Sequence, residues 1–233
     1  MNSRLAIYCD FDGTITVRDS VDFLLEHVAG DGWELIEKAW ERGEIGSREC
    51  MDRQVALFEG GWPAIEKVLA KIEIDPSFKA FAKWCQDRQI EFNVVSDGID
   101  RTIEFILRRE GIVVSTVAAN HLVEEGNSLC LEFPFKSEDK SCASGVCKCK
   151  ILEKNAGRLK RVFIGDGRSD FCCAGKSDIL FAKHKLATYC QESGISFIPF
   201  QSFDDIQVSL QEMFNLQCGE SAIVDIGRVS SKT

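Results

Sequence analysis

The sequence predicts an α/β fold, a doubly wound parallel sheet with an inserted helical cap and a small β-hairpin insertion. Short apolar runs, typical of buried strands, alternate along the chain with amphipathic patterns of helical spacing. Three of these runs also end in polar, glycine-containing turns. With 233 residues, 45% of them hydrophobic, the chain is long enough to bury a large core.

The first strand is predicted at residues 5–9, an uninterrupted apolar run. Such a run is typical of a strand that is buried on both faces within a parallel sheet. Two carboxylates, Asp10 and Asp12, follow it in the sequence Asp-Phe-Asp-Gly-Thr. Open α/β sheets bind their ligands at the carboxyl ends of the strands. Because two acids this close repel each other, we expect a hard divalent cation with oxygen ligands beside them.

A helical stretch follows the first strand directly and runs from residue 16 to residue 73. Val21, Leu24, Leu25 and Val28 have the spacing of a single apolar helix face. Similar patterns, separated by glycines, predict further helices at residues 33–42, 47–58 and 64–72. We interpret this stretch as a cap over the carboxyl edge of the sheet.

Strands and helices alternate again from residue 74 onward. A helix is predicted after Pro76, and an apolar run at 92–95 predicts a strand that ends at the Ser-Asp-Gly sequence of residues 96–98. A helix around residues 103–107 follows. Two further strands, expected at 113–122 and 128–133 with a turn between them, predict the small hairpin.

The last third of the chain continues the same pattern. A polar loop with several cysteines spans residues 136–148 and precedes a helix at 151–156. The remaining elements are strands at 161–164, 179–182 and 195–198, and an amphipathic helix at 203–213. The predicted organisation is a core of residues 1–15 and 74–216 with the hairpin and cysteine loop at about 113–147, a cap of residues 16–73, and a flexible tail of residues 217–233.

Polar motifs stand at the ends of three predicted strands: the Asp-Phe-Asp-Gly-Thr sequence at 10–14, Ser-Asp-Gly at 96–98, and Gly-Asp-Gly-Arg-Ser-Asp at 165–170. A single Asp-Gly pair is an ordinary turn. Three such motifs at strand ends that meet at one sheet edge favour a functional site. In this order the motifs resemble the haloacid dehalogenase superfamily of aspartate-nucleophile phosphatases, and the likeness covers nearly the whole chain.

The resemblance implies phosphoryl transfer that depends on Mg²⁺. Asp10 is expected to be the nucleophile and to form an aspartyl-phosphate. Asp12 is expected to protonate the leaving alkoxide and then to take a proton from the attacking water. The resemblance assigns Mg²⁺ to the side chains of Asp10 and Asp166 and to the backbone carbonyl of Asp12, with Asp170 acting through water or as support.

The phosphate oxygens are expected to be held by Ser96 and by the amides of Asp97 and Gly98. The superfamily also needs one lysine near the phosphate, and two candidates stand close together. The Lys-x-x-Ile-Leu pattern of relatives with this type of cap favours Lys148. Lys150 is the alternative, and it is otherwise interpreted as a solvated lysine in the first turn of a helix.

Three branches of the superfamily share features with the chain. The cap placement resembles phosphoserine phosphatases, and the 165–172 motif and Ser96-Asp97 resemble phosphoethanolamine/phosphocholine phosphatases. The sequences at 9–16 and 133–135 resemble the methionine-salvage phosphatase that acts on 2-hydroxy-3-keto-5-methylthiopentenyl-1-phosphate. The resemblance thus implies a small phosphorylated metabolite, the salvage phosphate first. A phosphotransferase and a non-catalytic ligand-binding protein of this fold are the alternatives from other classes.

Three residues are candidates for substrate specificity. Asp19 occupies the position where phosphoserine phosphatases carry a glutamate that holds the amine of the substrate. Arg53 lies one residue away from the register of their carboxylate-binding arginine, and a helix-surface arginine is the alternative interpretation. Asp97 is a candidate contact for a cationic head group.

Composition narrows the classes of partner and location. The formal net charge of −9 argues against a nucleic acid or an anionic membrane as partner. No apolar stretch approaches the length of a membrane helix and no leader pattern is present, so we expect a cytoplasmic protein, a monomer or homodimer. Eleven cysteines, an odd number, leave reduced thiols, disulfides or a structural metal open for Cys142, Cys147 and Cys149.

Overall fold

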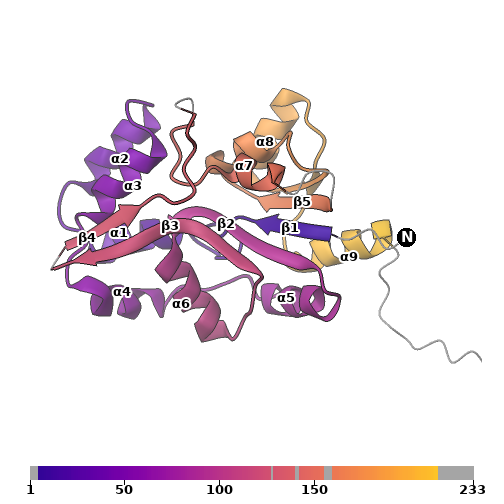
Figure 1. Cartoon of the computed structure of the whole chain (residues 1–233), viewed down its shortest axis with the longest axis horizontal. Helices are drawn as coiled ribbons and strands as arrows, with labels where there is room; N and C mark the ends of the chain where they lie inside the picture. Colours follow the sequence, from indigo (N-terminus) through magenta and orange to yellow (C-terminus); the bar gives the residue numbers. More distant parts are fainter. Residues whose placement is uncertain (1–4, 127, 140–141, 155–158, 215–233) are drawn as a thin grey trace, which may run out of the picture.

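The computed structural model describes residues 5–126, 128–139, 142–154 and 159–214, so the tail expected at 217–233 lies outside the described residues. Within these ranges the strands form one sheet of seven, in the order β4-β3-β2-β1-β5-β6-β7 (Figure 1). Neighbouring strands are parallel except for β3 and β4. This arrangement confirms the predicted fold class. The strands are β1 (Leu5–Cys9), β2 (Glu91–Ile99), β3 (Thr116–Glu125), β4 (Ser128–Glu132), β5 (Lys160–Gly165), β6 (Ile179–Ala182) and β7 (Ile198–Pro199).

Helices cover both faces of the sheet (Figure 1). One face carries α5 (Phe78–Asp87), α6 (Asp100–Glu110) and α9 (Phe203–Phe214), and the other carries α7 (Lys148–Glu153) and α8 (His184–Ser193). Side chains of β1 alternate between two apolar clusters, because successive residues of a strand point to opposite faces. Ile7 and Cys9 belong to one cluster, and Ala6 and Tyr8 belong to the other. The buried β1 strand therefore fixes the position of the acids that follow it.

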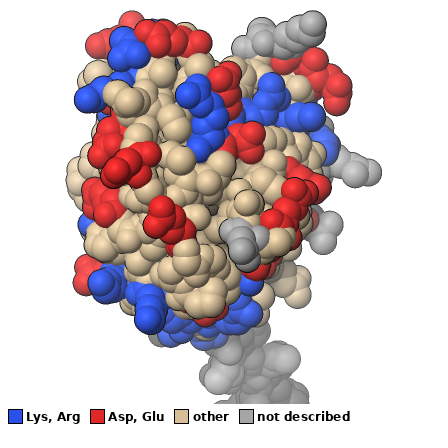
Figure 2. Space-filling model, turned by 90° about the vertical axis from the view of Figure 1, so that its left-hand side faces the viewer, with Lys and Arg blue, Asp and Glu red and all other residues tan. Residues whose placement is uncertain are grey.

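The expected helical stretch lies around the carboxyl end of β1 (Figure 1). Its helices are α1 (Ser20–Val28), α2 (Trp33–Glu41), α3 (Ser47–Val55) and α4 (Gly61–Leu69). The two chain segments that lead into and out of it run side by side, since Val17 N donates to Glu73 O at 2.9 Å and Asp75 N donates to Ile15 O at 2.8 Å. Figure 2 shows this end of the molecule, where acidic side chains border much of an uncharged central area. Its division from the core as a cap stays a proposal.

Three elements differ from the sequence prediction. β2 does not end before the Ser-Asp-Gly motif but continues through it to Ile99, with an irregular register against β3 after Val95. β3 is not confined to a hairpin, because its first half pairs in parallel with β2 and only its second half pairs with β4. The helix expected at 151–156 begins earlier, at Lys148, and is α7.

One smaller difference concerns the start of a strand. β7 covers only Ile198–Pro199, whereas a strand was expected from residue 195. β7 lies at the edge of the sheet and pairs with β6 alone, so an apolar pattern in the sequence specifies its ends only weakly.

Among the described residues, no helix has both the length and the apolar character needed to cross a bilayer.

Candidate active site

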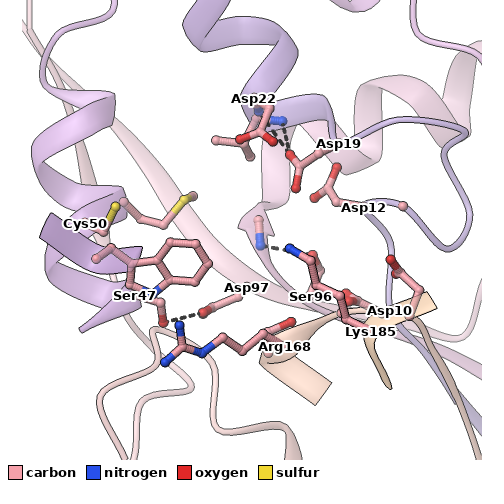
Figure 3. Close-up of a pocket in the computed structure, with 18 of the residues that line it drawn as sticks. Asp10, Asp12, Asp19, Asp22, Ser47, Cys50, Ser96, Asp97, Arg168 and Lys185 are labelled. Atoms are coloured by element: carbon pink, nitrogen blue, oxygen red, sulfur yellow. Dashed lines mark hydrogen bonds between the residues drawn. The ribbon is translucent and has the colours of Figure 1, made fainter. Parts of the chain in front are cut away.

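A cavity of about 590 Å³ lies at the carboxyl ends of the central strands, between the sheet and helices α1–α3. All three sequence motifs line it, through residues that include Asp10, Asp12, Ser96 and Asp166. In Figure 3, Asp10 and Ser96 lie on one side of the cavity and Cys50 of α3 lies on the opposite side. The topology therefore brings the predicted motifs together at one place.

A buried lysine joins two of the predicted carboxylates. Lys148 Nζ lies 2.8 Å from Asp10 Oδ1 and 2.7 Å from Asp170 Oδ1. All three side chains are buried, and Lys148 is only 1% exposed. Burial alone would lower the pKa of Lys148, but the carboxylates of Asp10 and Asp170 raise it well above its usual value, so the ammonium stays charged. Lys150, by contrast, is exposed on α7.

Three carboxylates converge beside this lysine. Oxygens of Asp10, Asp166 and Asp170 all lie within 4.8 Å of one another. Burial raises the pKa of Asp10 well above its ordinary value, and the neighbouring Asp170 raises it further. Burial likewise raises the pKa of Asp166, although Thr14 Oγ1 donates to it at 2.6 Å. Repulsion of this kind is what a bound cation with oxygen ligands relieves, so the group fits the hard ion expected from the sequence.

Gly13 permits the close approach of this cluster to the first motif. Its φ of +73° is one that side-chain-bearing residues rarely adopt. A Cβ atom at this position would also lie 2.7 Å from Asp166 Oδ2. The glycine of the Asp-Phe-Asp-Gly-Thr sequence is thus needed both for the turn and for the packing of a carboxylate against it.

Asp12 points away from the carboxylate cluster toward the start of α1. Its Oδ1 accepts hydrogen bonds from the backbone N–H of Ser20, at 2.8 Å, and from the Ser20 hydroxyl. Burial, with the charge of Asp19 added, raises the pKa of Asp12 to about 7. Asp10 and Asp12 therefore have different surroundings, one held by a lysine and the other by neutral donors.

Asp19 caps the first helix of the inserted stretch. Its carboxylate accepts hydrogen bonds from Val21 N at 2.8 Å and Asp22 N at 3.0 Å, as expected of a residue that precedes a helix. Burial and the neighbouring Asp22 raise the pKa of Asp19 to about 7. The residue lines the cavity on the side of α1.

The second motif contributes the hydroxyl of Ser96 and the carboxylate of Asp97, which contacts two other segments of the chain. Ser96 Oγ accepts a hydrogen bond of 3.0 Å from Gly98 N. Both oxygens of Asp97 accept hydrogen bonds from other segments, Oδ2 from Ser47 Oγ at 2.7 Å and Oδ1 from Val146 N at 2.9 Å. Asp97 thus joins β2 to α3 and to the loop that leads into α7.

Arg53 does not line the cavity. It is exposed and pairs with Glu49 at 3.4 Å. The cavity face of α3 instead carries residues at the i, i+3, i+4 and i+7 positions of the helix: Ser47, Cys50, Met51 and Gln54. Residue 53 lies about 100° around the helix from residue 54, which explains the difference.

Two polar residues of the cavity wall, Glu37 and Gln54, were not singled out from the sequence. Both sit within amphipathic helices, where a polar residue is ordinarily solvated. The only available signal was the helical spacing of Gln54 from the apolar Cys50 and Met51. That spacing places Gln54 on the buried side, but it does not distinguish a cavity from a helix contact.

The described cysteines are free thiols. Cys147 Sγ and Cys149 Sγ lie 3.5 Å apart, and Cys172 Sγ and Cys173 Sγ lie 3.8 Å apart. Within the part of the chain that the structure describes, the aspartate cluster is the group whose ligand atoms converge closely enough to hold a metal ion.

The fold and the site can now be compared with known proteins. The family model of haloacid dehalogenase-like hydrolases matches residues 7–175. The chain belongs to this family. The matched range of this haloacid dehalogenase-like hydrolase contains all three polar motifs and Lys148.

Two relatives cover nearly all of this haloacid dehalogenase-like hydrolase. A protein of Lysinibacillus sphaericus named 2-hydroxy-3-keto-5-methylthiopentenyl-1-phosphate phosphatase is 30% identical over 216 residues, 89% of this chain and 94% of the relative. The polyol phosphate phosphatase of Saccharomyces cerevisiae is 30% identical over 241 residues, 96% of this chain and 98% of the relative. A solved phosphoserine phosphatase, a phospho-aspartyl intermediate analogue, has a TM-score of 0.67 at 20% identity, covering 90% of this chain and 99% of that chain, and so shares the fold.

These findings confirm three of the sequence predictions. The resemblance to the superfamily, the fold class and the class of enzyme, a phosphatase of the haloacid dehalogenase type, are all supported by the family model together with the named relatives and the shared fold.

Proposed function

We propose that this chain hydrolyses a small phosphomonoester with the help of Mg²⁺, through a phosphorylated Asp10. The chain is a phosphatase of the haloacid dehalogenase family that acts on small phosphorylated metabolites. The observation that carries the finer proposal is the buried contact of Lys148 with Asp10 and Asp170 beside the carboxylate cluster. A cation and a set of oxygen ligands are what a phosphoryl group requires at its point of transfer.

Asp10 is the proposed nucleophile. Its Oδ1 accepts hydrogen bonds from Lys148 Nζ and from Phe11 N, both at 2.8 Å. These contacts fix the carboxylate, and we assign attack on phosphorus to the other oxygen, Oδ2. The new bond joins Oδ2 to phosphorus while the ester bond to the leaving oxygen breaks. Water then cleaves the aspartyl-phosphate, which releases inorganic phosphate and restores the Asp10 carboxylate.

Asp12 is the proposed acid and base. A pKa raised by burial to about 7 allows this carboxyl to hold a proton near neutral pH and to give it to the leaving alkoxide. The carboxylate that remains then takes a proton from the attacking water. The hydrogen bonds from Ser20 fix the side chain in position for both transfers.

Mg²⁺ is the proposed cofactor. The residues proposed to hold it are Asp10 and Asp166 through their side chains, Asp12 through its backbone carbonyl, and Asp170 through water or as support. The fit rests on the all-oxygen donor set and on the mutual repulsion of the three acids, of which Asp10 and Asp170 are buried and Asp166 is half-buried. When bound, the ion supplies positive charge that offsets the negative charge of the phosphoryl group.

The phosphate oxygens are proposed to be bound by Lys148 and by the second motif. Ser96 Oγ accepts the N–H of Gly98, so its own proton remains available for a phosphate oxygen. The backbone N–H of Asp97 is the further proposed donor. The carboxylate of Asp97 already accepts two hydrogen bonds, so its proposed contribution to phosphate binding comes from the backbone.

The salvage metabolite 2-hydroxy-3-keto-5-methylthiopentenyl-1-phosphate is the first proposed substrate, because a relative at 30% identity is named for it. Phosphoethanolamine or phosphocholine and phosphoserine are the alternatives from the sequence motifs. Asp19 is the proposed substrate contact on the helical side of the cavity. We also propose a cytoplasmic location and a monomeric or homodimeric state, which fractionation and sedimentation would test.

Release of inorganic phosphate tests the proposed function. The purified chain, incubated with these phosphomonoesters and with p-nitrophenyl phosphate, is expected to release phosphate with Mg²⁺ and to stop when EDTA is added. Release that is unaffected by EDTA would contradict the role of the metal. Turnover that requires a second alcohol and yields a new phosphoester would instead identify the phosphotransferase.

A further inference from the structure

The cavity extends beyond the catalytic carboxylates to a polar pair between α2 and α3. Gln54 lines the cavity although it is only 2% exposed, and its Nε2 donates to Glu37 Oε2 at 2.9 Å. The thiol of Cys50 lies 3.8 Å from the same carboxylate oxygen. In Figure 3, Cys50 stands across the cavity from Asp10. The pair thus belongs to the wall that faces whatever is attached to the phosphate.

We propose that Glu37 and Gln54 select the leaving group, and that they favour an uncharged, hydroxylated leaving group over one that carries a carboxylate. This inference rests on the proposed function, since it assumes that the phosphate lies at Asp10. It assigns substrate discrimination to the wall formed by α2 and α3.

The hydrogen bonds of Gln54 support a ligand with a hydroxyl. Among the described residues, the side-chain amide of Gln54 makes one hydrogen bond, the one to Glu37. Buried amides ordinarily satisfy both ends, so the remaining amide atom is available to a ligand in the cavity. A hydroxyl both donates and accepts, and therefore complements a carboxylate beside an amide.

The charges of this wall disfavour a ligand carboxylate. Asp19, Asp22 and Glu37 all line the cavity on this side. A carboxylate transferred from water into a cavity is costly unless a cation pairs with it. Arg18, which precedes Asp19 in the chain and also lines the cavity, is already paired with Glu26 at 2.9 Å and lies over the Phe23 ring.

The other cations that line the cavity, Arg168 and Lys185, come from the core, Arg168 from the segment after β5 and Lys185 from α8, and not from the wall of α2 and α3. Arg168 lies over the ring of Trp40, with 5.6 Å between the guanidinium carbon and the ring centroid. A ligand carboxylate has no proton to give to Glu37 or to Gln54 Oε1, whereas a hydroxyl can donate to either of them. The pair therefore separates a hydroxyl from a carboxylate.

Substrate discrimination provides the test. Glycerol 1-phosphate, phosphoserine and phosphoethanolamine are compared by kcat/KM, with p-nitrophenyl phosphate as the reference for catalysis. The wild-type chain is expected to prefer glycerol 1-phosphate. In Glu37→Gln and Gln54→Leu, the ratio of kcat/KM for glycerol 1-phosphate to that for phosphoserine is expected to fall about tenfold, mainly through KM, as one lost hydrogen bond predicts.

Glu34→Gln is the matched control, because Glu34 is exposed on the same helix and does not line the cavity. It is expected to keep the wild-type ratio. A wild-type preference for phosphoserine over glycerol 1-phosphate, or unchanged ratios in both variants, would overturn the inference. The comparison of kcat/KM between substrates in the wild-type chain tests the inference even where a variant fails to fold. If the wild-type chain shows no Mg²⁺-dependent hydrolysis of p-nitrophenyl phosphate, that result would instead contradict the proposed function.

Discussion

Ser47 on α3 donates a hydrogen bond of 2.7 Å to Asp97 on β2, which links the inserted helices to the strand that carries Ser96. The other oxygen of Asp97 accepts Val146 N, two residues before Lys148. One carboxylate therefore ties together a helix of the proposed cap, a catalytic strand and the segment that leads to the buried lysine. We propose that Asp97 positions these parts.

Asp97→Ala is expected to lower kcat by about tenfold or more, because small displacements of groups such as Lys148 are costly in catalysis. Ser47→Ala removes only one of the two links and is expected to reduce the free energy of unfolding by about 1 kcal/mol. Steady-state kinetics and urea unfolding measure the two effects. Wild-type kcat in Asp97→Ala would show that the link has no catalytic consequence.

Lys148→Ala is expected to destabilise the metal-free protein by about 3–5 kcal/mol, because it leaves the carboxylates of Asp10 and Asp170 buried without their cation. Lys150→Ala is the matched control, since Lys150 is exposed and its replacement is expected to change stability by no more than about 0.5 kcal/mol. Urea unfolding in EDTA measures both. Equal stability of the two variants would contradict the buried contact.

The kcat for hydrolysis of an alkyl phosphate is expected to fall as the pH rises through about 7. Burial raises the pKa of Asp12 to about that value, so the carboxyl loses above it the proton that an alkoxide leaving group needs. An alkyl phosphate should show this fall in kcat, and p-nitrophenyl phosphate, with a better leaving group, should show less. In Asp12→Asn the residual rate is expected to lose this pH dependence. The same alkaline fall in the variant would assign it to another group.

Mg²⁺ is expected to raise the melting temperature of the EDTA-treated chain, because an ion that binds only the folded state stabilises it. Asp166→Asn should reduce this rise by removing one carboxylate of the cluster. Asp87→Asn is the control, since Asp87 is an exposed residue that pairs with Lys83 on α5. Scanning calorimetry with and without the ion checks the prediction, and an equal rise in both variants would exclude the cluster as the site.

Much of this architecture follows from local patterns in the sequence. The run before Asp10 identified β1 because a strand buried on both faces is continuously apolar. The meeting of the three motifs followed from parallel strand order, which fixes the edge at which side chains gather. Lys148 required the family pattern, since spacing alone does not distinguish a buried lysine from the exposed Lys150.

Other features depend on tertiary contacts. A rotation of about 100° per residue separates the exposed Arg53 from the cavity-lining Gln54, so an error of one residue in helix register changes which side chain faces the cavity. The continuation of β2 through Ser96 depends on renewed pairing with β3 at Ile99, after an irregular stretch of the register that begins at Val95. No local pattern specifies such pairing.

Phosphorylation of Asp10 is the central claim, and trapping the intermediate tests it most directly. The chain is mixed with an excess of phosphomonoester and Mg²⁺, quenched in acid during turnover and digested for mass spectrometry. We expect one phosphoryl group on the peptide that contains Asp10. In Asp10→Asn we expect neither this phosphoryl group nor turnover. Sustained turnover by Asp10→Asn, or a phosphoryl group on another residue, would contradict it.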